Sequence, residues 1–545
     1  SAARLKAALQ QNSIITPGKE LGEADMTNTY TQLRGRFDER NGGFGGAPKF
    51  PTPHHLLFLL RYWKRTDDKQ ALFMVEKTLQ AMRQGGIYDH IGFGFHRYST
   101  DSHWLASHFE KMLYDQALLA TAYIEAYQAT GKEEYSQTAR EIFSYVLRDM
   151  QSARGGFYSA EDADSEGQEG KFYLWTLSQI REVLSKTDAE LAVKVFNLAE
   201  GGNFTSEARG SEDGNNIPHL TESIEEPVAG LNMTPADLRQ RLEMIRQQLF
   251  AHREKRVHPG KDDKILTDWN GLMIAALAQG ARALDEPRYA DAARRAADFI
   301  MKNLRKPDGR LLHRYSRGQA AVPANLDDYV FMIYGLLELY ETTFEVDYLK
   351  TALDLNRDLV EHFWDEVDGG FYFTADDAEN LLVRQKQIYD GAVPSGNSVA
   401  MLNLLRLARL TANTGLEQRA ARIGAAFSDT VRQQPSAYTQ LMAALDFAVG
   451  PSYEVVIVGN PAGDDTRAMV AAIRRRFIPN KIVILRPAGA PSPGIDNIAP
   501  FARHHEASNG KATAYVCLNY NCKLPTTDIN AMIELLNSKE TRGLK

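Results

Sequence analysis

Histidines are concentrated in one stretch of the chain. His90, His96, His103 and His108 lie within nineteen residues, shortly after the Gly-Gly pair at 85–86. Imidazole groups titrate near neutral pH, so they can take up and return a proton during a reaction. A packed core has no need for four of them so close together. The segment therefore predicts a small-molecule site, with His96 and His108 as its candidate proton-transfer residues.

The same stretch contains a candidate binding face. If residues 104–127 form a helix, four side chains fall together beside an apolar stripe: Trp104, His108, Lys111 and Asp115. The histidine, lysine and aspartate could share a proton network, and the tryptophan could stack on a sugar ring. The alternative is that Lys111 and Asp115 form an ordinary i,i+4 ion pair on a solvated surface.

An acidic turn at 161–167 partly matches a calcium-binding loop. Asp162 and Asp164 occupy ligand positions, but Tyr173 stands where the loop requires a bidentate glutamate. We therefore expect no metal here. The two aspartates are predicted either to accept hydrogen bonds from hydroxyl groups or basic side chains, or to form a solvated acidic turn.

Two later segments place carboxylates near the start of predicted helices. In the first, Thr267 or Asp268 can cap the helix, which leaves four residues for function: Asp263, Lys264, Trp269 and Asn270. In the second, one of Asp327 and Asp328 is expected to be the cap and the other to be free. Carboxylates on separate hairpins are what glycoside hydrolysis requires, so Asp263 with Asp327 or Asp328 forms a candidate pair.

The polar loop 390–398 leads into another predicted helix. Ser395 or Asn397 can cap that helix, and Asp390 is available to line a pocket. An ordinary helix start explains the same residues equally well.

Repeated helix pairs organise most of the chain. A Tyr-x3-Ala motif opens a helical segment that leads to a glycine loop, and the three copies begin at Tyr135, Tyr289 and Tyr348. Another helix precedes each copy. Such pairs either stack into an open solenoid or close into a toroid. Long polar loops at 155–177, 200–225 and 365–395 favour a mainly α, closed toroid with one site at its rim.

The pattern changes after Gly450. Residues 1–450 are predicted to form the toroid and residues 451–545 a small α/β domain with a short parallel sheet. Its expected strands and helices are 453–458, 465–477, 481–485, 514–518 and 527–536. The loop after the first strand lacks the full glycine fingerprint of a nucleotide site.

Composition excludes several classes of protein. The formal net charge is −7, and no long basic run is present, so nucleic acid is not an expected partner. No uninterrupted apolar stretch is long enough to span a membrane. Cys517 and Cys522 match neither a redox nor a zinc motif and are expected to be two unrelated thiols. So few cysteines suit a reducing compartment, and we expect a cytoplasmic protein.

Six ordered motifs, spread over nearly the whole chain, resemble a known family: residues 42–51, 96–101, 108–115, 162–165, 268–272 and 394–398. They are similar to the spermatogenesis-associated, thioredoxin-domain-containing proteins. The resemblance implies an (α/α)6 toroid of six helical hairpins, like that of N-acylglucosamine 2-epimerases and six-hairpin glycosidases. It also implies an N-terminal thioredoxin-like domain, and this chain begins after the point where that domain would end.

The expected function is that of a sugar epimerase or isomerase. His96 and His108 would move the proton α to an open-chain carbonyl, and Arg97 and Lys111 would stabilise the enediolate. Other expected substrate contacts are Trp104, Glu110, Tyr114, Asp115, Asp162, Asp164, Trp175, Lys264, Trp269, Asn270, Tyr329, Arg384, Asp390, Ser395 and Asn397. We expect no cofactor or metal.

Two alternatives are a glycoside hydrolase with paired carboxylates and a non-catalytic module. The module would bind a ligand or client for a linked or separate thioredoxin-like domain. A saccharide remains the expected small-molecule partner in both enzyme hypotheses.

Overall fold

The computed structural model describes residues 17–204, 214–221, 233–379, 381–489 and 493–537. Part of the predicted polar loop 200–225 therefore lies outside the described residues. Among the helices that are described, none is both long and apolar enough to cross a lipid bilayer.

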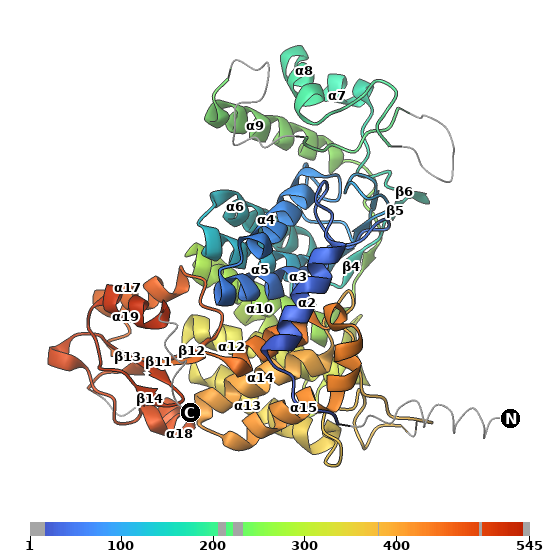
Figure 1. Ribbon diagram of the computed structural model, residues 1–545. Helices are drawn as coiled ribbons and strands as arrows, with labels where there is room; N and C mark the ends of the chain where they lie inside the picture. The colour runs from blue at the N-terminus through green and yellow to red at the C-terminus, as the bar shows by residue number, and fades with distance from the viewer. Residues whose placement is uncertain (1–16, 205–213, 222–232, 380, 490–492, 538–545) are drawn as a thin grey trace.

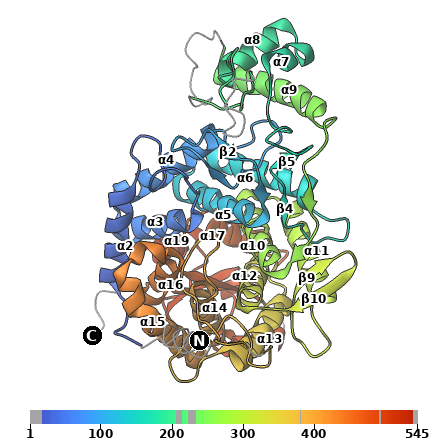
Figure 2. The same cartoon turned by 90° about the vertical axis from the view of Figure 1, so that its right-hand side faces the viewer.

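Within the described residues, six helices form an inner ring: α3 (Pro53–Thr66), α5 (Leu113–Thr130), α10 (Thr267–Leu284), α12 (Leu326–Thr343), α14 (Gly396–Thr411) and α16 (Thr439–Val449). Each packs against the next, and α16 packs against α3, so the ring is closed. The outer helices are α2 (Glu23–Arg36), α4 (Lys69–Gln84), α6 (Glu133–Tyr145), α11 (Pro287–Asn303), α13 (Val346–Phe363) and α15 (Thr414–Gln433). This arrangement, visible in Figure 2, confirms the predicted (α/α)6 toroid.

Apolar patterning separates the two rings. Helices α5, α10 and α12 are buried almost all round, as expected for helices enclosed on every side. The outer helices other than α2 are amphipathic, and the Tyr-x3-Ala motifs lie on three of them, α6, α11 and α13. Tyr135, Ala139, Tyr289 and Ala293 are fully buried against the inner ring. The repeat thus encodes the contact between an outer helix and its inner partner.

Amide side chains on two inner helices bind the backbone of the glycine loops that follow outer helices. Asn270 accepts a hydrogen bond from the Phe157 amide at 2.8 Å and donates to the Phe157 carbonyl at 3.0 Å. Asn397 does the same to Phe371, at 2.7 and 2.9 Å. Both side chains are completely buried. The prediction that Asn270 and Asn397 contact substrate is therefore wrong, because their polar atoms are used to close the Gly-Gly-Phe loops.

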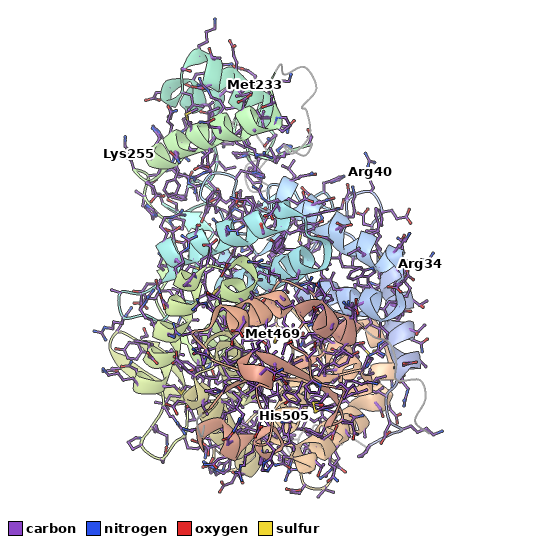
Figure 3. All side chains as sticks on the ribbon, turned by 90° about the vertical axis from the view of Figure 1, so that its left-hand side faces the viewer. Arg34, Arg40, Met233, Lys255, Met469 and His505 are labelled. Atoms are coloured by element: carbon purple, nitrogen blue, oxygen red, sulfur yellow. A yellow bond between two sulfur atoms is a disulfide. The ribbon has the colours of Figure 1, made fainter. Side chains whose placement is uncertain are left out.

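Three helices project beyond one end of the toroid: α7 (Leu177–Val183), α8 (Lys186–Val195) and α9 (Pro235–Arg253). They form an extension at the top of Figure 1, and Figure 3 marks Met233 and Lys255 near the two ends of α9. The extension has its own apolar core, in which Trp175 is fully buried. Trp175 is thus a core residue, with the Arg256 guanidinium 4.1 Å from its ring centroid, and not a platform for sugar.

Short strands connect the loops at the same end. The pairs are β1 (Tyr98–Ser99) with β2 (Ser107–His108), β3 (Lys111–Met112) with β4 (Ala160–Glu161) and β7 (Lys261–Asp262), and β5 (Asp164–Ser165) with β6 (Gln168–Glu169). A further sheet contains β8 (Ile265–Leu266), β9 (Leu312–Ser316) and β10 (Gln319–Pro323). These pairings fix the loops in front of α5, α10 and α12.

The C-terminal module contains β11 (Tyr453–Gly459), α17 (Asp464–Arg474), β12 (Lys481–Pro487), α18 (Pro493–Ile498), β13 (Thr513–Leu518), β14 (Asn521–Cys522) and α19 (Ile529–Asn537). Its sheet has the order β12-β11-β13-β14. β11 and β12 are parallel as predicted, but β13 is antiparallel to β11, so the sheet is mixed. The reason is that β13 starts at the same end of β11 at which β12 finishes, so the chain does not return along the length of the strands before β13 begins.

The two cysteines correct another prediction. Cys517 and Cys522 are direct partners across the β13–β14 hairpin and form a disulfide. The hairpin brings together two residues that the sequence spacing alone had left unrelated.

Candidate active site at the mouth of the toroid

Carboxylates gather where the inner helices begin. Outer and inner helices alternate along the chain from α2 to α16, and the starts of α5, α10, α12 and α14 lie at the same end of the toroid, where their side chains meet. Asp115 lies in the first turn of α5, Asp268 in that of α10, and Asp327 and Asp328 in that of α12. The positive end of a helix dipole favours a nearby negative charge. The fold therefore assembles one acidic mouth from distant parts of the chain.

Asp328 organises the centre of this group. It is completely buried and accepts hydrogen bonds from the Asn325 amide at 2.8 Å and the Asp268 amide at 3.1 Å. Its two carboxylate oxygens lie 2.9 and 3.1 Å from Nδ1 of His313 on β9. The N-cap of α12 is Asn325, so the prediction that one of the two aspartates is the cap is wrong; Asp328, at the third position of the helix, completes the capping box, and Asp327 takes no part in it.

The three groups at this centre have altered acidities. A hydrogen bond to Asp328 raises the pKa of His313 to about 9, so the imidazole is protonated at neutral pH. Burial and the neighbouring Asp328 raise the pKa of Asp268 well above its usual range. Ligand atoms of Asp268, His313 and Asp328 lie within 4.8 Å of one another, a spacing that suits a divalent cation. A protonated His313 could not serve as its ligand.

Asp327 has the acidity of a proton carrier near neutral pH. Burial and the charge of Asp328 raise its pKa to about 7, although the Gly396 amide favours the ionised form. Asp327 is only half-buried, so solvent or a ligand can reach it. The mouth therefore presents one carboxyl whose pKa is raised well above its usual range and one that titrates near neutral pH.

Asp327→Asn is expected to stabilise the protein at pH 8 by on the order of 2 kcal/mol, and by much less at pH 5. The folded protein keeps the Asp327 proton up to about pH 7, whereas the unfolded chain loses it near pH 4. Folding is therefore less favourable as the pH rises between these values, and asparagine removes that cost. Urea unfolding at both pH values measures the difference. Equal stabilisation at both would contradict the assigned acidity.

A second group faces the mouth from α5. Arg97 forms an ion pair with Glu110 at 3.0 Å, and the charge of Arg97 also acts on Asp115. Asp115 is buried, and its Oδ2 has no hydrogen-bond partner within the described part of the chain. Burial raises the pKa of Asp115 well above its usual range. An orphaned buried oxygen beside a guanidinium is suited to binding a hydroxyl group.

An aromatic pair accompanies these polar groups. The rings of Tyr114 on α5 and Trp269 on α10 meet edge to face, with centroids 4.8 Å apart. Trp269 is half-buried and Tyr114 is buried, so the indole is the more accessible of the two. Such a ring can stack on the apolar face of a sugar.

The predicted helical face at 104–115 is wrong. Helix α5 begins only at Leu113, because residues 107–108 and 111–112 are held as strands β2 and β3. Trp104 is buried, and its Nε1 donates to the Asn41 carbonyl at 3.0 Å. Lys111 is also buried and pairs with Asp89 at 2.9 Å. Of the four predicted residues, only Asp115 lies on α5 at the mouth.

The two candidate histidines occupy different surroundings. His96 is buried, its Nδ1 lies 2.9 Å from the Phe109 carbonyl, and burial, with the nearby Lys111, lowers its pKa to about 3. His108 is half-buried, with Nδ1 2.7 Å from Glu169. Its Nε2 lies 3.8 Å from Glu110, which links it through Arg97 to the edge of the mouth. The structure therefore does not present the two imidazoles as a pair.

Other predicted contacts serve the fold or the surface. Asp162 and Asp164 are exposed beside β5, and Asp263 is exposed, with Ser316 donating to it at 3.3 Å. Lys264 pairs with Asp262 at 2.7 Å. These positions do not join the acidic mouth, because they lie on the loops outside the helix starts.

Four more side chains hold neighbouring backbone. The Tyr329 hydroxyl is buried and accepts from the Leu311 amide at 3.1 Å. Arg384 donates to the Thr374 carbonyl. Ser395 is the predicted cap of α14, accepting from the Ser398 amide at 3.1 Å. Asp390 accepts from the amides of Ser395 and Gln440, both at 2.9 Å, and so joins the starts of α14 and α16.

Sequence reasoning missed Asp268 and His313 as functional residues. The sequence offers Thr267 or Asp268 as the cap of α10, but neither side chain caps the helix, and within the described residues Asp268 accepts a hydrogen bond from the adjacent Trp269 amide at 2.8 Å. His313 lies on a hairpin with no recognisable motif. The signal for Asp268 is the Asp-Trp-Asn-Gly sequence at 268–271, which contains more polar groups than one cap explains.

Comparison with known proteins identifies the family. No family model matches the chain. The human protein named spermatogenesis-associated protein 20 is 36% identical over 569 residues, covering 98% of this chain and 72% of its own length. Its rat counterpart is 35% identical over the same shares, and a Caenorhabditis elegans protein is 30% identical, covering 94% of this chain and 74% of its own length.

Among solved structures, a D-mannose isomerase has a TM-score of 0.49 at 12% identity, covering 75% of this chain and 85% of its own. A heparin-specific unsaturated glucuronyl hydrolase has a TM-score of 0.46 at 11% identity, covering 77% and 95%. Likenesses of this size assign no reaction. The sequence identity to the curated relatives establishes the family. The chain belongs to the spermatogenesis-associated protein 20 family.

Proposed function

We propose that this chain is a carbohydrate-active enzyme that hydrolyses a glycosidic bond by acid–base catalysis at the acidic mouth. The observation that carries the proposal is the contrast between two carboxyls. Burial and the neighbouring Asp328 raise the pKa of Asp268 well above its usual range, whereas the pKa of Asp327 is raised to about 7. Two carboxyl groups with separated acidities are what glycoside hydrolysis requires.

In this reaction Asp268 is the general acid and donates its proton to the leaving oxygen. Asp327, as the carboxylate, takes a proton from the attacking water. Asp328 and the His313 imidazolium form an ion pair, 2.9 Å apart, next to the general acid Asp268. Trp269 supports the sugar ring, while Arg97 and Asp115 bind its hydroxyl groups. The predicted pair with Asp263 is thereby replaced by Asp268 with Asp327.

Epimerisation or isomerisation is the second candidate. The protonated His313, whose pKa is about 9, could stabilise an enediolate, while Asp327 removes the proton α to the carbonyl and Asp268 returns one. This is the predicted chemistry with its proton carriers moved from His96 and His108 to the aspartates.

One experiment separates the possibilities. The protein is incubated with a panel of nitrophenyl glycosides and, in deuterated water, with free mono- and disaccharides. Release of nitrophenol supports hydrolysis, whereas deuterium incorporation at C2 supports epimerisation. Binding of a sugar without either product would favour the non-catalytic module, and the absence of binding and turnover across the panel would sink the carbohydrate proposal.

The rate of the reaction should depend on pH through Asp327. We expect kcat/KM to rise as this carboxyl ionises, reaching half of its maximum near pH 7, and to fall at higher pH as Asp268 loses its proton. In Asp327→Asn the residual rate should lack the rising limb. If kcat/KM of the wild type rose around pH 4, or if the rise near pH 7 persisted in Asp327→Asn, the general base would be another group.

A further inference from the structure

The disulfide of the C-terminal module is exposed on one side only. Cys517 on β13 is fully buried, whereas Cys522 on β14 is exposed. An external thiol can therefore reach the sulfur of Cys522 but not that of Cys517. This asymmetry sets the direction of any exchange reaction, because attack occurs at the accessible sulfur.

The hairpin that carries the cysteines is also held by other contacts. The Tyr520 hydroxyl donates to the Ala408 carbonyl of α14 at 2.9 Å, and the Tyr520 amide donates to Glu454 at 3.1 Å. Asn519 accepts from Arg409 at 2.7 Å. These contacts anchor the turn without the disulfide. The two sulfurs would therefore remain opposite each other after reduction, as reversible exchange requires.

A histidine lies beside the exposed sulfur. Nε2 of His505 is 3.5 Å from Sγ of Cys522, and Figure 3 marks His505 on the C-terminal module. Burial lowers the pKa of His505, and the nearby Arg486 and His504 lower it further, so its imidazole is neutral at pH 7. A neutral imidazole can accept the proton of a reduced Cys522 thiol, which increases the thiolate fraction.

We propose that Cys517–Cys522 is a redox-active disulfide that exchanges with an external dithiol, with Cys522 as the sulfur that forms the mixed disulfide. A thiolate of the dithiol attacks Cys522, the Cys517–Cys522 bond breaks, and Cys517 leaves as a thiolate that takes up a proton. The second thiol of the dithiol then attacks the dithiol sulfur that is bonded to Cys522, and Cys522 leaves as a thiolate. The dithiol is oxidised by two electrons, and its two protons end on the cysteines, the one on Cys522 shared with His505.

This activity is separate from the proposed carbohydrate chemistry. It uses residues of the C-terminal module and α14, and none from the acidic mouth. Success or failure of the sugar panel therefore leaves the exchange reaction unaffected, and the two proposals can fail independently.

The first test measures whether the native disulfide exchanges. The full chain is treated with dithiothreitol without denaturant, freed of the reagent and alkylated in denaturant, and the mass of the intact protein is measured. We expect both cysteines to be alkylated while the circular dichroism spectrum is retained, and the disulfide to re-form on addition of oxidised glutathione. A disulfide that resists dithiothreitol until the protein unfolds would overturn the proposal.

The second test assigns the roles of the two sulfurs. In native Cys517→Ser, dithionitrobenzoate should react with Cys522, whereas in Cys522→Ser the remaining Cys517 should react at least about tenfold more slowly. Adding His505→Gln to Cys517→Ser should lower the rate about tenfold at pH 7, because the thiolate fraction falls. His504→Gln in the same background is the matched control and should leave the rate unchanged. Equal rates in the two serine variants, or no effect of His505→Gln, would refute the assignment.

Discussion

Asp268→Asn is expected to lower kcat about 10³-fold on the substrate found with the glycoside and sugar panel, with little change in KM. Asparagine preserves the shape of the side chain and its acceptor for the Trp269 amide, which lies 2.8 Å from Asp268. It cannot donate a carboxylic proton to the leaving oxygen. The loss should therefore appear in the chemical step, while sugar binding, measured by calorimetry, is retained.

Asp263→Asn is the matched control for this variant. Asp263 is exposed on the adjacent loop, and its replacement should leave kcat within about twofold of wild type, because surface changes have small effects. A large loss in Asp263→Asn together with normal turnover in Asp268→Asn would restore the carboxylate pair predicted from the sequence. It would also remove the role proposed for the Asp328–His313 pair.

Asp89→Asn is expected to destabilise the protein by about 3–5 kcal/mol. Asp89 accepts from both terminal nitrogens of Arg253, at 2.8 and 2.9 Å, and from Lys111 at 2.9 Å. All three side chains are almost fully buried. Removing the carboxylate leaves two buried cations without their counter-ion, and it also loosens the end of α9 from the toroid.

The pH dependence of stability provides a further check on Asp89. Burial alone would raise its pKa, but Arg253 and Lys111 hold the pKa well below the usual range. The stability that Asp89 contributes is therefore fully present above the unfolded-state pKa of about 3.9 and is lost as the pH falls through the lower folded-state value. The deficit of the variant should thus be constant between pH 5 and pH 8.

Urea and thermal unfolding of wild type, Asp89→Asn and the exposed control Asp164→Asn measure this deficit. The control should change stability by less than about 0.5 kcal/mol. A deficit below 1 kcal/mol in Asp89→Asn, or one that grows steeply across neutral pH, would show that the ion cluster is not the cause.

The repetition of helix pairs was predictable because it is a local property. Tyr135 and Ala139, like Tyr289 and Ala293, lie one turn apart and mark the buried face of an outer helix. The start of a helix near aspartates 327 and 328 was predictable for the same reason, although its N-cap is Asn325. A helix start needs one capping side chain, and capping acts over three residues. The sequence by itself therefore determined the repeated helix pairs and most of the segments that reach the rim of the toroid.

The chemistry of the mouth was decided only by the tertiary structure. Whether residues 107–112 are helix or strand depends on pairing with residues 98–99 and 160–161, and that pairing moved Trp104 and Lys111 into the core. Burial and the charge of Asp328 raise the pKa of Asp268, and a hydrogen bond to Asp328 raises that of His313, although Asp328 belongs to another hairpin. Cys517 and Cys522 meet because a turn pairs their strands. Acidity and reactivity depend on charges and burial supplied by distant segments, so local patterns locate the functional segments but cannot assign their proton carriers.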